Sequence, residues 1–225
     1  MDKMTRVLIA DDDPLVRSGL RLMLGGAPDI EVVAEAADGT DVQPRVDEYH
    51  PDLVLMDIRM PRMDGLTATA ALRRRPDPPE VLILTTFSTD SYVLEALRAG
   101  AAGYVLKHTP PAQIIAAVRN VVAGEPVLSP AAVKLLITTV ASAENGAVLS
   151  RDGDRDEADR LLVRLGRRER EVALAVGQGK TNAEIAAALH MSVPTVKAHV
   201  SHILTKLNLT NRVQIALVVY RAGIV

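Results

Sequence analysis

Short apolar runs alternate with amphipathic stretches five times across residues 1–124, and this alternation constrains the fold more than any other feature. A helix between two strands brings the chain back to the end of the sheet where the first strand began, so such strands pair in parallel. The expected strands are 6–10, 31–36, 53–57, 81–85 and 103–107, and the expected helices are 14–24, 40–49, 66–74, 91–99 and 111–123. The sequence therefore predicts a first domain of the α/β class, with helices on both faces of a parallel sheet.

The rest of the chain is organised differently. Residues 129–141 have the pattern of an amphipathic helix, and the polar, charged and glycine-containing segment that follows is typical of a linker. From residue 161 onward every apolar repeat has a helical spacing. We therefore expect a linker over 125–160 that contains one helix (about 129–141), followed by an all-α domain over 161–225.

Composition restricts the chemistry. Of the 225 residues, 48% are hydrophobic but only 2% are aromatic, so the core must be aliphatic. The chain has no Cys, which excludes disulfides and Cys-ligated metals. We find neither an apolar run near the ~18 residues of a membrane span nor the pattern of a signal peptide. The expected location is therefore cytoplasmic, with no membrane partner.

The net charge of −2 is unevenly distributed along the chain. Residues 1–124 have a net charge of −5 and residues 125–163 one of −3, whereas residues 164–225 have a net charge of +6. This division favours two modules with different partners, the basic one being the candidate for binding a polyanion such as nucleic acid.

Polar side chains stand at the ends of four of the five expected strands. Asp11 and Asp12 follow the first strand, Asp57 ends the third, Thr85 ends the fourth and Lys107 ends the fifth. The carboxyl ends of parallel strands meet at one edge of the sheet, where ligands of such folds bind. We therefore expect these side chains to form one site.

The chemistry of that site follows from its groups. Crowded carboxylates repel one another unless a cation lies among them, and hard oxygen ligands suit Mg²⁺. With a metal and the Lys107 ammonium beside it, Asp57 is placed to act as a nucleophile toward a phosphoryl group. The two cations offset charge on the phosphoryl oxygens, and Thr85 can donate a hydrogen bond to one of them.

Four segments, VLIADDDPLVR, DLVLMDIRMPRMDG, VLILTTF and AGAAGYVLK, resemble the receiver domain of two-component response regulators, in the same order and at suitable spacing. The resemblance implies a flavodoxin-like, doubly wound five-stranded sheet with strand order 2-1-3-4-5, and a sensor histidine kinase as phosphoryl donor. It implies that Asp57 is the phosphoacceptor and that Mg²⁺ is held by Asp11, Asp12, Asp57 and the backbone carbonyl of Arg59. It also implies that Thr85 is the switch hydroxyl, that Lys107 is the cation that pairs with the phosphate, and that Tyr104 is the switch aromatic. Asp13 is expected to point away.

The basic segment contains two helices joined by a tight turn, GKTNAEIAAALHMSVPTVKAHVSHILTKLNL. Thr181 and Glu184 have the spacing of a capping box, and Ser192 can cap the second helix. Apolar residues recur along one face of that helix, at Val196, Val200, Ile203 and Leu207. The opposite face carries Lys197, Ala198 and Ser201, a cation among small residues that can approach base edges in the major groove of DNA.

The longer stretch RREREVALAVGQGKTNAEIAAALHMSVPTVKAHVSHILTKLNLTNRVQIAL resembles the four-helix DNA-binding domain of the NarL/FixJ (LuxR-type) family. The resemblance implies base contacts by Lys197, Ala198 and Ser201, phosphate contacts by Asn182, Thr195, Lys206 and Arg212, and a structural role for Glu169. Its partner would be double-stranded DNA, bound at promoter half-sites by a homodimer that forms on activation.

Both resemblances imply a DNA-binding response regulator, in which phosphorylation of Asp57 by a sensor histidine kinase switches receiver conformation and dimerisation and so controls promoter binding and transcription. Two alternatives remain. One is an orphan LuxR-type transcription factor that binds DNA without phosphorylation. The other is an Mg-dependent aspartyl-phosphate phosphatase, although no inserted cap over the pocket is visible in the sequence. We expect a protein that is not an enzyme.

Overall fold

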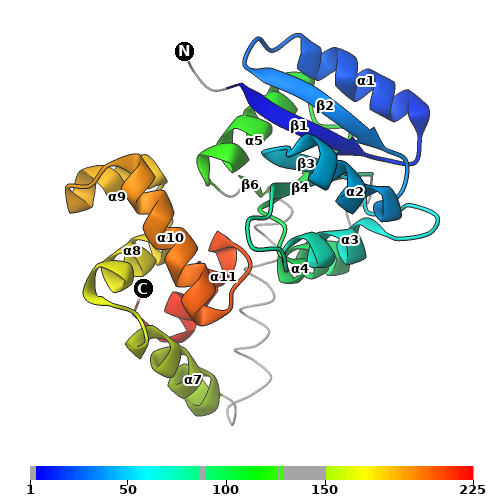
Figure 1. Ribbon diagram of the computed structural model, residues 1–225. Coiled ribbons are helices and arrows are strands. Elements are labelled where there is room, and N and C mark those ends of the chain that lie inside the picture. The colour runs from blue at the N-terminus through cyan, green and yellow to red at the C-terminus, as the bar shows by residue number, and fades with distance from the viewer. Residues whose placement is uncertain (1–3, 87–89, 126, 129–150, 225) are drawn as a thin grey trace. The chain divides into compact units, whose positions relative to one another are not determined.

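The computed structural model describes residues 4–86, 90–125, 127–128 and 151–224 (Figure 1). The chain divides into two compact units, Met1–Val133 and Lys134–Val225, and each is described by itself. The helix expected at 129–141 lies outside the described residues. Among the described helices, none has the length and apolar character needed to cross a membrane.

The first unit contains a parallel sheet whose strands follow the order β2-β1-β3-β4-β5-β6. The strands are β1 (Thr5–Ala10), β2 (Ile30–Ala36), β3 (Leu53–Met56), β4 (Glu80–Thr85), β5 (Gly103–Leu106) and β6 (Val127–Leu128). The predicted α/β class and the implied order of the first five strands are confirmed. The short β6, which adds a sixth strand beside β5, was not predicted.

Helices cover both faces of this sheet (Figure 1). They are α1 (Pro14–Gly25), α2 (Gly39–Tyr49), α3 (Gly65–Leu72), α4 (Asp90–Ala99) and α5 (Pro111–Ala123). Apolar residues of α1 and α5 share one core with the strands, and α2, α3 and α4 lie side by side on the other face. Because both faces are covered, all four residues of β3 are buried. Asp57 is the first residue beyond β3, and Lys107 is the first beyond β5.

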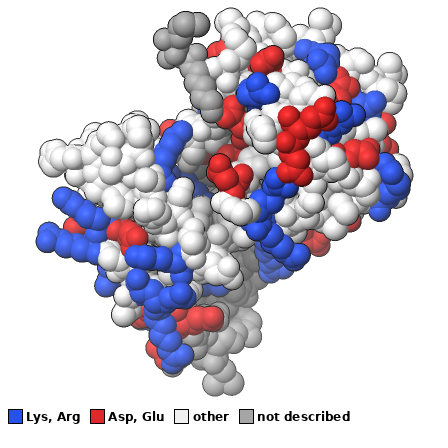
Figure 2. Space-filling view, viewed as in Figure 1, with Lys and Arg blue, Asp and Glu red and all other residues white. Residues whose placement is uncertain are grey.

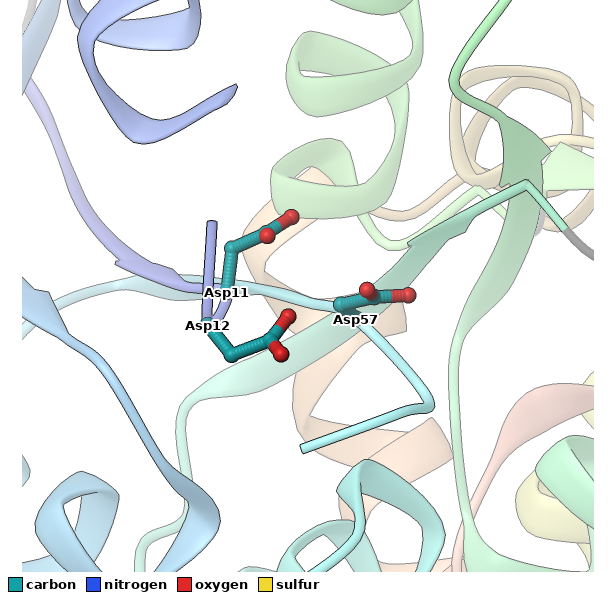
Figure 3. A group of neighbouring side chains, drawn as sticks. All are labelled: Asp11, Asp12 and Asp57. Carbon is teal, nitrogen blue, oxygen red and sulfur yellow. The ribbon is translucent and has the colours of Figure 1, made fainter. Parts of the chain in front are cut away.

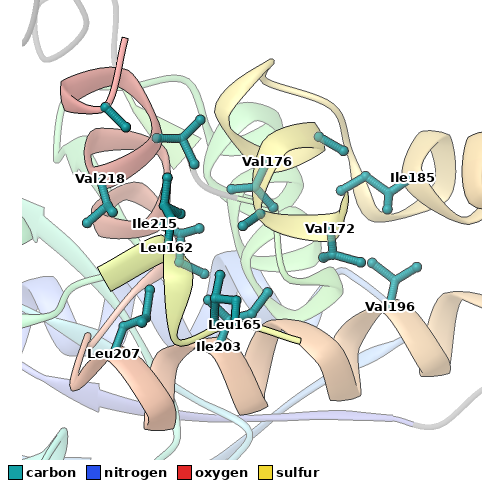
Figure 4. Packing of buried hydrophobic residues seen from close by; sticks show 14 of the residues in the cluster. Leu162, Leu165, Val172, Val176, Ile185, Val196, Ile203, Leu207, Ile215 and Val218 are labelled. Carbon is teal, nitrogen blue, oxygen red and sulfur yellow. The ribbon is translucent and has the colours of Figure 1, made fainter. Parts of the chain in front are cut away.

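The described part of the second unit is helical throughout, as predicted. Its helices are α7 (Arg151–Val163), α8 (Arg167–Gly177), α9 (Asn182–Leu189), α10 (Val193–Leu207) and α11 (Arg212–Arg221). They surround an aliphatic core to which α7, α8, α9, α10 and α11 all contribute (Figure 4).

Residues 151–160 were expected to belong to the linker, and the structure differs from this expectation. They form most of α7, and Ala158 and Leu162 of that helix are buried in the core of the second unit. The segment is so rich in charged residues that its narrow apolar stripe, with one Ala and one Leu four residues apart, was not recognised as a helix face. The described helices of the second unit therefore begin at Arg151, about ten residues before the predicted start at residue 161.

Candidate functional site

The acidic pocket lies at the carboxyl ends of β1 and β3. Asp11 and Asp57 are buried, with 1% and 6% of their surfaces exposed, whereas Asp12 is exposed. Each of the three residues has a carboxylate oxygen within 4.8 Å of an oxygen of the others (Figure 3). The structure thus brings together the three acids that the sequence assigned to one site.

Lys107 joins the two buried acids. Its Nζ lies 2.6 Å from Asp11 Oδ2 and 2.8 Å from Asp57 Oδ2. The other Asp57 oxygen, Oδ1, accepts a hydrogen bond from the backbone N–H of Ile58 at 2.7 Å. One ammonium therefore offsets the repulsion between two carboxylates that water reaches poorly.

The pKa values of Asp11 and Lys107 are shifted both by burial and by the neighbouring charges. Burial raises the pKa of the Asp11 carboxyl, although its hydrogen bond with Lys107 opposes that effect. Burial alone would lower the pKa of Lys107, but the hydrogen bonds with Asp11 and Asp57 outweigh it, and the pKa is raised. Lys107 is therefore a firmly protonated cation at the centre of the pocket.

Thr85 and Tyr104 lie beside the pocket on neighbouring strands. Thr85 ends β4 and Tyr104 lies in β5, and both side chains are fully buried. Burial, together with the charge of Asp57, raises the pKa of the Tyr104 phenol to about 12, so it stays neutral. The resemblance assigned Tyr104 to an inward-turning switch, and in this structure its ring is already inside.

The remaining receiver residues are placed as follows. Asp13 caps α1, accepting a hydrogen bond from the backbone N–H of Leu15 at 2.8 Å, so its expected direction away from the pocket is confirmed. The exposed Arg59 side chain lies in the loop after Asp57 and donates a hydrogen bond to the Tyr92 hydroxyl at 3.3 Å. The role of the Arg59 carbonyl as a metal ligand stays a prediction.

Two supports of the pocket were not predicted. Gly65 is required at the start of α3, because a Cβ there would lie 1.9 Å from the backbone oxygen of Asp57. Arg17 of α1 donates a hydrogen bond from Nη1 to the backbone oxygen of Asp11 at 2.7 Å, and its Nε lies 3.1 Å from Glu35. A helix arginine gives no sequence signal of such a role, since its partners belong to other elements.

In the second unit, α9 and α10 form the predicted helix-turn-helix. The backbone N–H of Glu184 donates to Thr181 Oγ1, and Glu184 accepts from the N–H of Thr181, which completes the capping box. His190 ends α9 in the left-handed region with φ 53°, and Ser192 caps α10. The turn between the two helices is therefore short. A backbone hydrogen bond from His190 ends α9, and a side-chain hydrogen bond to Ser192 begins α10.

The two faces of α10 also match the prediction. Val196, Ile203 and Leu207 are buried in the core, whereas Lys197, Ala198 and Ser201 are exposed. Basic side chains prevail over acidic ones on the visible surface of this unit (Figure 2). An exposed helix face with one cation and small neighbours can enter a DNA groove.

The side chains of all four predicted phosphate contacts already have partners within the unit. Lys206 Nζ lies 2.6 Å from Glu169 Oε2, and Arg212 donates hydrogen bonds to Asn182 Oδ1 and to the backbone oxygen of Lys180. Asn182 is only 3% exposed, so its side chain has little free surface, and its contact with phosphate stays a prediction. Its amide oxygen accepts a hydrogen bond from Arg212. Thr195 is exposed, and its Oγ1 shares a hydrogen bond of 2.7 Å with Ser192 Oγ.

Glu169 has the structural role that the resemblance implied. It accepts hydrogen bonds from Lys206 and from the backbone N–H of Gly166 at 2.8 Å, and both interactions lower the pKa of its carboxyl. The stabilisation that this lowered pKa represents is present above pH 4.5, the usual pKa, and is lost as pH falls through the lowered value.

Replacing Lys206 is therefore expected to raise the pKa of Glu169. In the Lys206→Met variant the carboxyl loses its main stabilising cation, and its pKa should move back toward 4.5. Carboxyl-carbon NMR over a pH titration of the full chain measures this shift. Arg221→Met, which removes a cation at the end of α11, is the control and should leave the pKa of Glu169 unchanged. Equal pKa values of Glu169 in the wild type and in Lys206→Met would contradict the proposed effect of Lys206.

Comparison with known proteins defines the class. Residues 7–119 match the family "Response regulator receiver domain", and residues 163–219 match "Bacterial regulatory proteins, luxR family". The chain belongs to the response regulators that join a receiver to a LuxR-type DNA-binding domain, and it is a DNA-binding regulator of transcription.

Individual relatives match almost end to end. The transcriptional regulatory protein LiaR of Bacillus subtilis (strain 168) is 38% identical over 99% of this chain and 100% of its own length. The oxygen regulatory protein NreC of Staphylococcus aureus (strain MRSA252) is 39% identical over 92% of this chain and 93% of its own length. The crystal structure of ChrA, the response regulator of a heme-sensing two-component system, is 35% identical, covers 100% of both chains and gives a TM-score of 0.52.

Proposed function

We propose that Asp57 accepts a phosphoryl group from a sensor histidine kinase and that this modification controls DNA binding by the second unit. The observation that carries the proposal is the pair of contacts from the Lys107 ammonium to the buried carboxylates of Asp11 and Asp57. Such a cation, held next to a nucleophilic carboxylate at the end of a strand, is suited to pair with a phosphoryl oxygen.

We further propose that Mg²⁺ binds in this pocket. The three clustered carboxylates are hard oxygen donors of the kind that Mg²⁺ prefers, so the residues fit the ion. Asp11, Asp12, Asp57 and the Arg59 carbonyl would hold it. When bound, the ion supplies positive charge against the phosphoryl oxygens.

The protein's own groups have distinct parts in the transfer. An Asp57 oxygen attacks phosphorus, forming the P–O bond of an acyl phosphate as the P–N bond to the kinase histidine breaks. Lys107 exchanges its contact with Asp57 for one with the new phosphoryl oxygens. Thr85, at the end of β4, donates its hydroxyl hydrogen to another of these oxygens, which couples the phosphoryl group to the neighbouring strand.

The phosphoryl signal reaches DNA through dimerisation in this proposal. Two phosphorylated chains pair, and the α10 helices of the two copies insert Lys197, Ala198 and Ser201 into adjacent half-sites of a promoter. Tethering the second α10 helix near its half-site raises its effective concentration and hence the overall affinity. The chain would act in the cytoplasm, where DNA and kinase are both accessible.

A comparison of DNA affinity with and without phosphorylation tests the proposal. The full chain is first used to select its binding sites from a random DNA library. Its affinity for a selected site is then measured at one fixed salt concentration with Mg²⁺, in the presence and in the absence of a small acyl phosphate. We expect at least a tenfold gain with the donor, corresponding to about 1.4 kcal/mol. Lys197→Ala should weaken binding in both conditions; an equal affinity with and without donor would instead indicate the phosphorylation-independent alternative.

A further inference from the structure

Asp38, a buried acid outside the predicted site, binds the loop that follows Asp57. It stands two residues beyond β2, is 3% exposed and caps α2 by accepting from the backbone N–H of Thr40 at 3.0 Å. It also accepts from two amides of a distant loop, with Oδ2 2.8 Å from the N–H nitrogen of Arg62 and Oδ1 3.3 Å from that of Met63. One carboxylate thus holds two loops together.

Further contacts fix the same loop at both ends. The backbone N–H of Gly39 donates to the backbone oxygen of Met63 at 3.2 Å, and that of Gly65 donates to the oxygen of Ile58 at 2.8 Å. A Cβ at Gly39 would lie 2.4 Å from the Met63 oxygen, so glycine is needed for this approach. The segment from Arg59 to Pro61 is therefore held at Ile58 on one side and by Asp38 on the other.

We propose that Asp38 is a positioning residue for the metal: by holding the Arg62 and Met63 amides, it places the Arg59 carbonyl at the Mg²⁺ position beside Asp57. The inference rests on the proposed function, because it needs Mg²⁺ in the acidic pocket. Only three residues separate Ile58 from Arg62, so a shift of the Arg62 amide, which Asp38 holds, is passed along a short stretch of backbone to the Arg59 carbonyl.

An ionised carboxylate suits this role better than an amide would. Asp38 accepts from the Thr40, Arg62 and Met63 amides and from the Thr40 hydroxyl at 2.9 Å. Burial would raise its pKa, but these hydrogen bonds and the nearby Arg62 guanidinium lower the pKa to about 2. An Asn side chain has one acceptor oxygen, so it would lose at least one of the two loop amides.

The test separates the loop contact from the helix cap. In Asp38→Ser the hydroxyl can still cap α2 but is too short and has too few oxygens to hold the Arg62 and Met63 amides as well. Asp41→Asn is the matched control, because Asp41 also contacts the Arg62 guanidinium, at 3.2 Å. Within the described part of the chain, the Asp41 carboxylate accepts hydrogen bonds from the side chains of Arg62 and Thr40 and not from the loop backbone. Asp38→Asn is the second variant, used if the serine variant fails to fold.

The readout is the Mg²⁺ dissociation constant of the full chain, measured by titration calorimetry without any phosphodonor. We expect binding weaker by about tenfold or more in Asp38→Ser, the range found when supports behind metal ligands are removed, and an intermediate loss in Asp38→Asn. Asp41→Asn should match the wild type. Thermal unfolding of each variant, recorded in parallel, reports on the helix cap.

The outcomes distinguish the two proposals. If the wild type binds Mg²⁺ and both Asp38 variants bind it equally well, the positioning role is overturned while the proposed function stands. The positioning role is also overturned if Asp41→Asn weakens Mg²⁺ binding as much as the Asp38 variants do. If the wild type binds no Mg²⁺, the proposed metal site and the inference built on it are both wrong.

Discussion

The Asp57→Asn variant is expected to gain no phosphoryl group from a small acyl phosphate and Mg²⁺, and its DNA affinity should not respond to the donor. The amide cannot replace the carboxylate as nucleophile, because it lacks the negative charge on the attacking oxygen. Its similar shape leaves the β3 end and the Ile58 N–H contact intact. The phosphorylated and unmodified forms are distinguished by intact-mass spectrometry.

Asp13→Asn provides the control for this loss. Asp13 lies next to the acidic pair but caps α1 instead of facing the pocket, and Asn is an equally good cap. This variant should therefore take up one phosphoryl group at the wild-type rate. Uptake by Asp57→Asn equal to that of the wild type would place the modification on another residue and remove the basis of the proposed switch.

The second large effect is expected for Lys107→Met. Only 15% of the Lys107 side chain is exposed, and the side chains of Asp11 and Asp57 are less than 10% exposed, so the variant leaves two buried carboxylates without their cation. Removing one partner of a buried ion pair typically lowers the free energy of unfolding by about 3–5 kcal/mol. We expect a loss of that size in the first unit when Mg²⁺ is absent.

Added Mg²⁺ should restore part of that stability. The ion binds the folded pocket and replaces some of the missing positive charge, so the difference between variant and wild type should shrink as its concentration rises. Urea unfolding of the full chain, followed at amides of the first unit by NMR, measures both effects. Lys107→Arg, which keeps the charge, is the control. Equal free energies of unfolding for Lys107→Met and wild type without Mg²⁺ would show that the ion pairs of Lys107 do not stabilise the first unit.

Much of the fold was predictable because buried strands and amphipathic helices each have a characteristic pattern of apolar residues in the sequence. Strands buried on both faces, such as Leu53–Met56, are continuous apolar runs, and amphipathic helices separate them. Two elements were missed for physical reasons. Strand β6 has two residues and therefore no period, and α7 has an apolar stripe too narrow to stand out among its charges.

The site was predictable to the extent that its residues stand at strand ends. Asp11, Asp57, Thr85 and Lys107 follow from the rule that carboxyl ends of parallel strands meet. Asp38 was missed, because Asp before Gly between two elements is typical of any turn. The contact between Lys206 and Glu169 joins residues 37 positions apart, and no local pattern indicates such a pairing.

The most direct test of the central claim is a crystal structure of the chain with Mg²⁺ and beryllium fluoride, a mimic of the phosphoryl group. We expect beryllium to be bonded to an Asp57 oxygen, with its fluorides near Lys107 Nζ and Thr85 Oγ1. We also expect Mg²⁺ to be coordinated by Asp11, Asp12, Asp57 and the Arg59 carbonyl. A pocket that stays empty at saturating concentrations of both, with Lys107 still bound to Asp11 and Asp57, would contradict it.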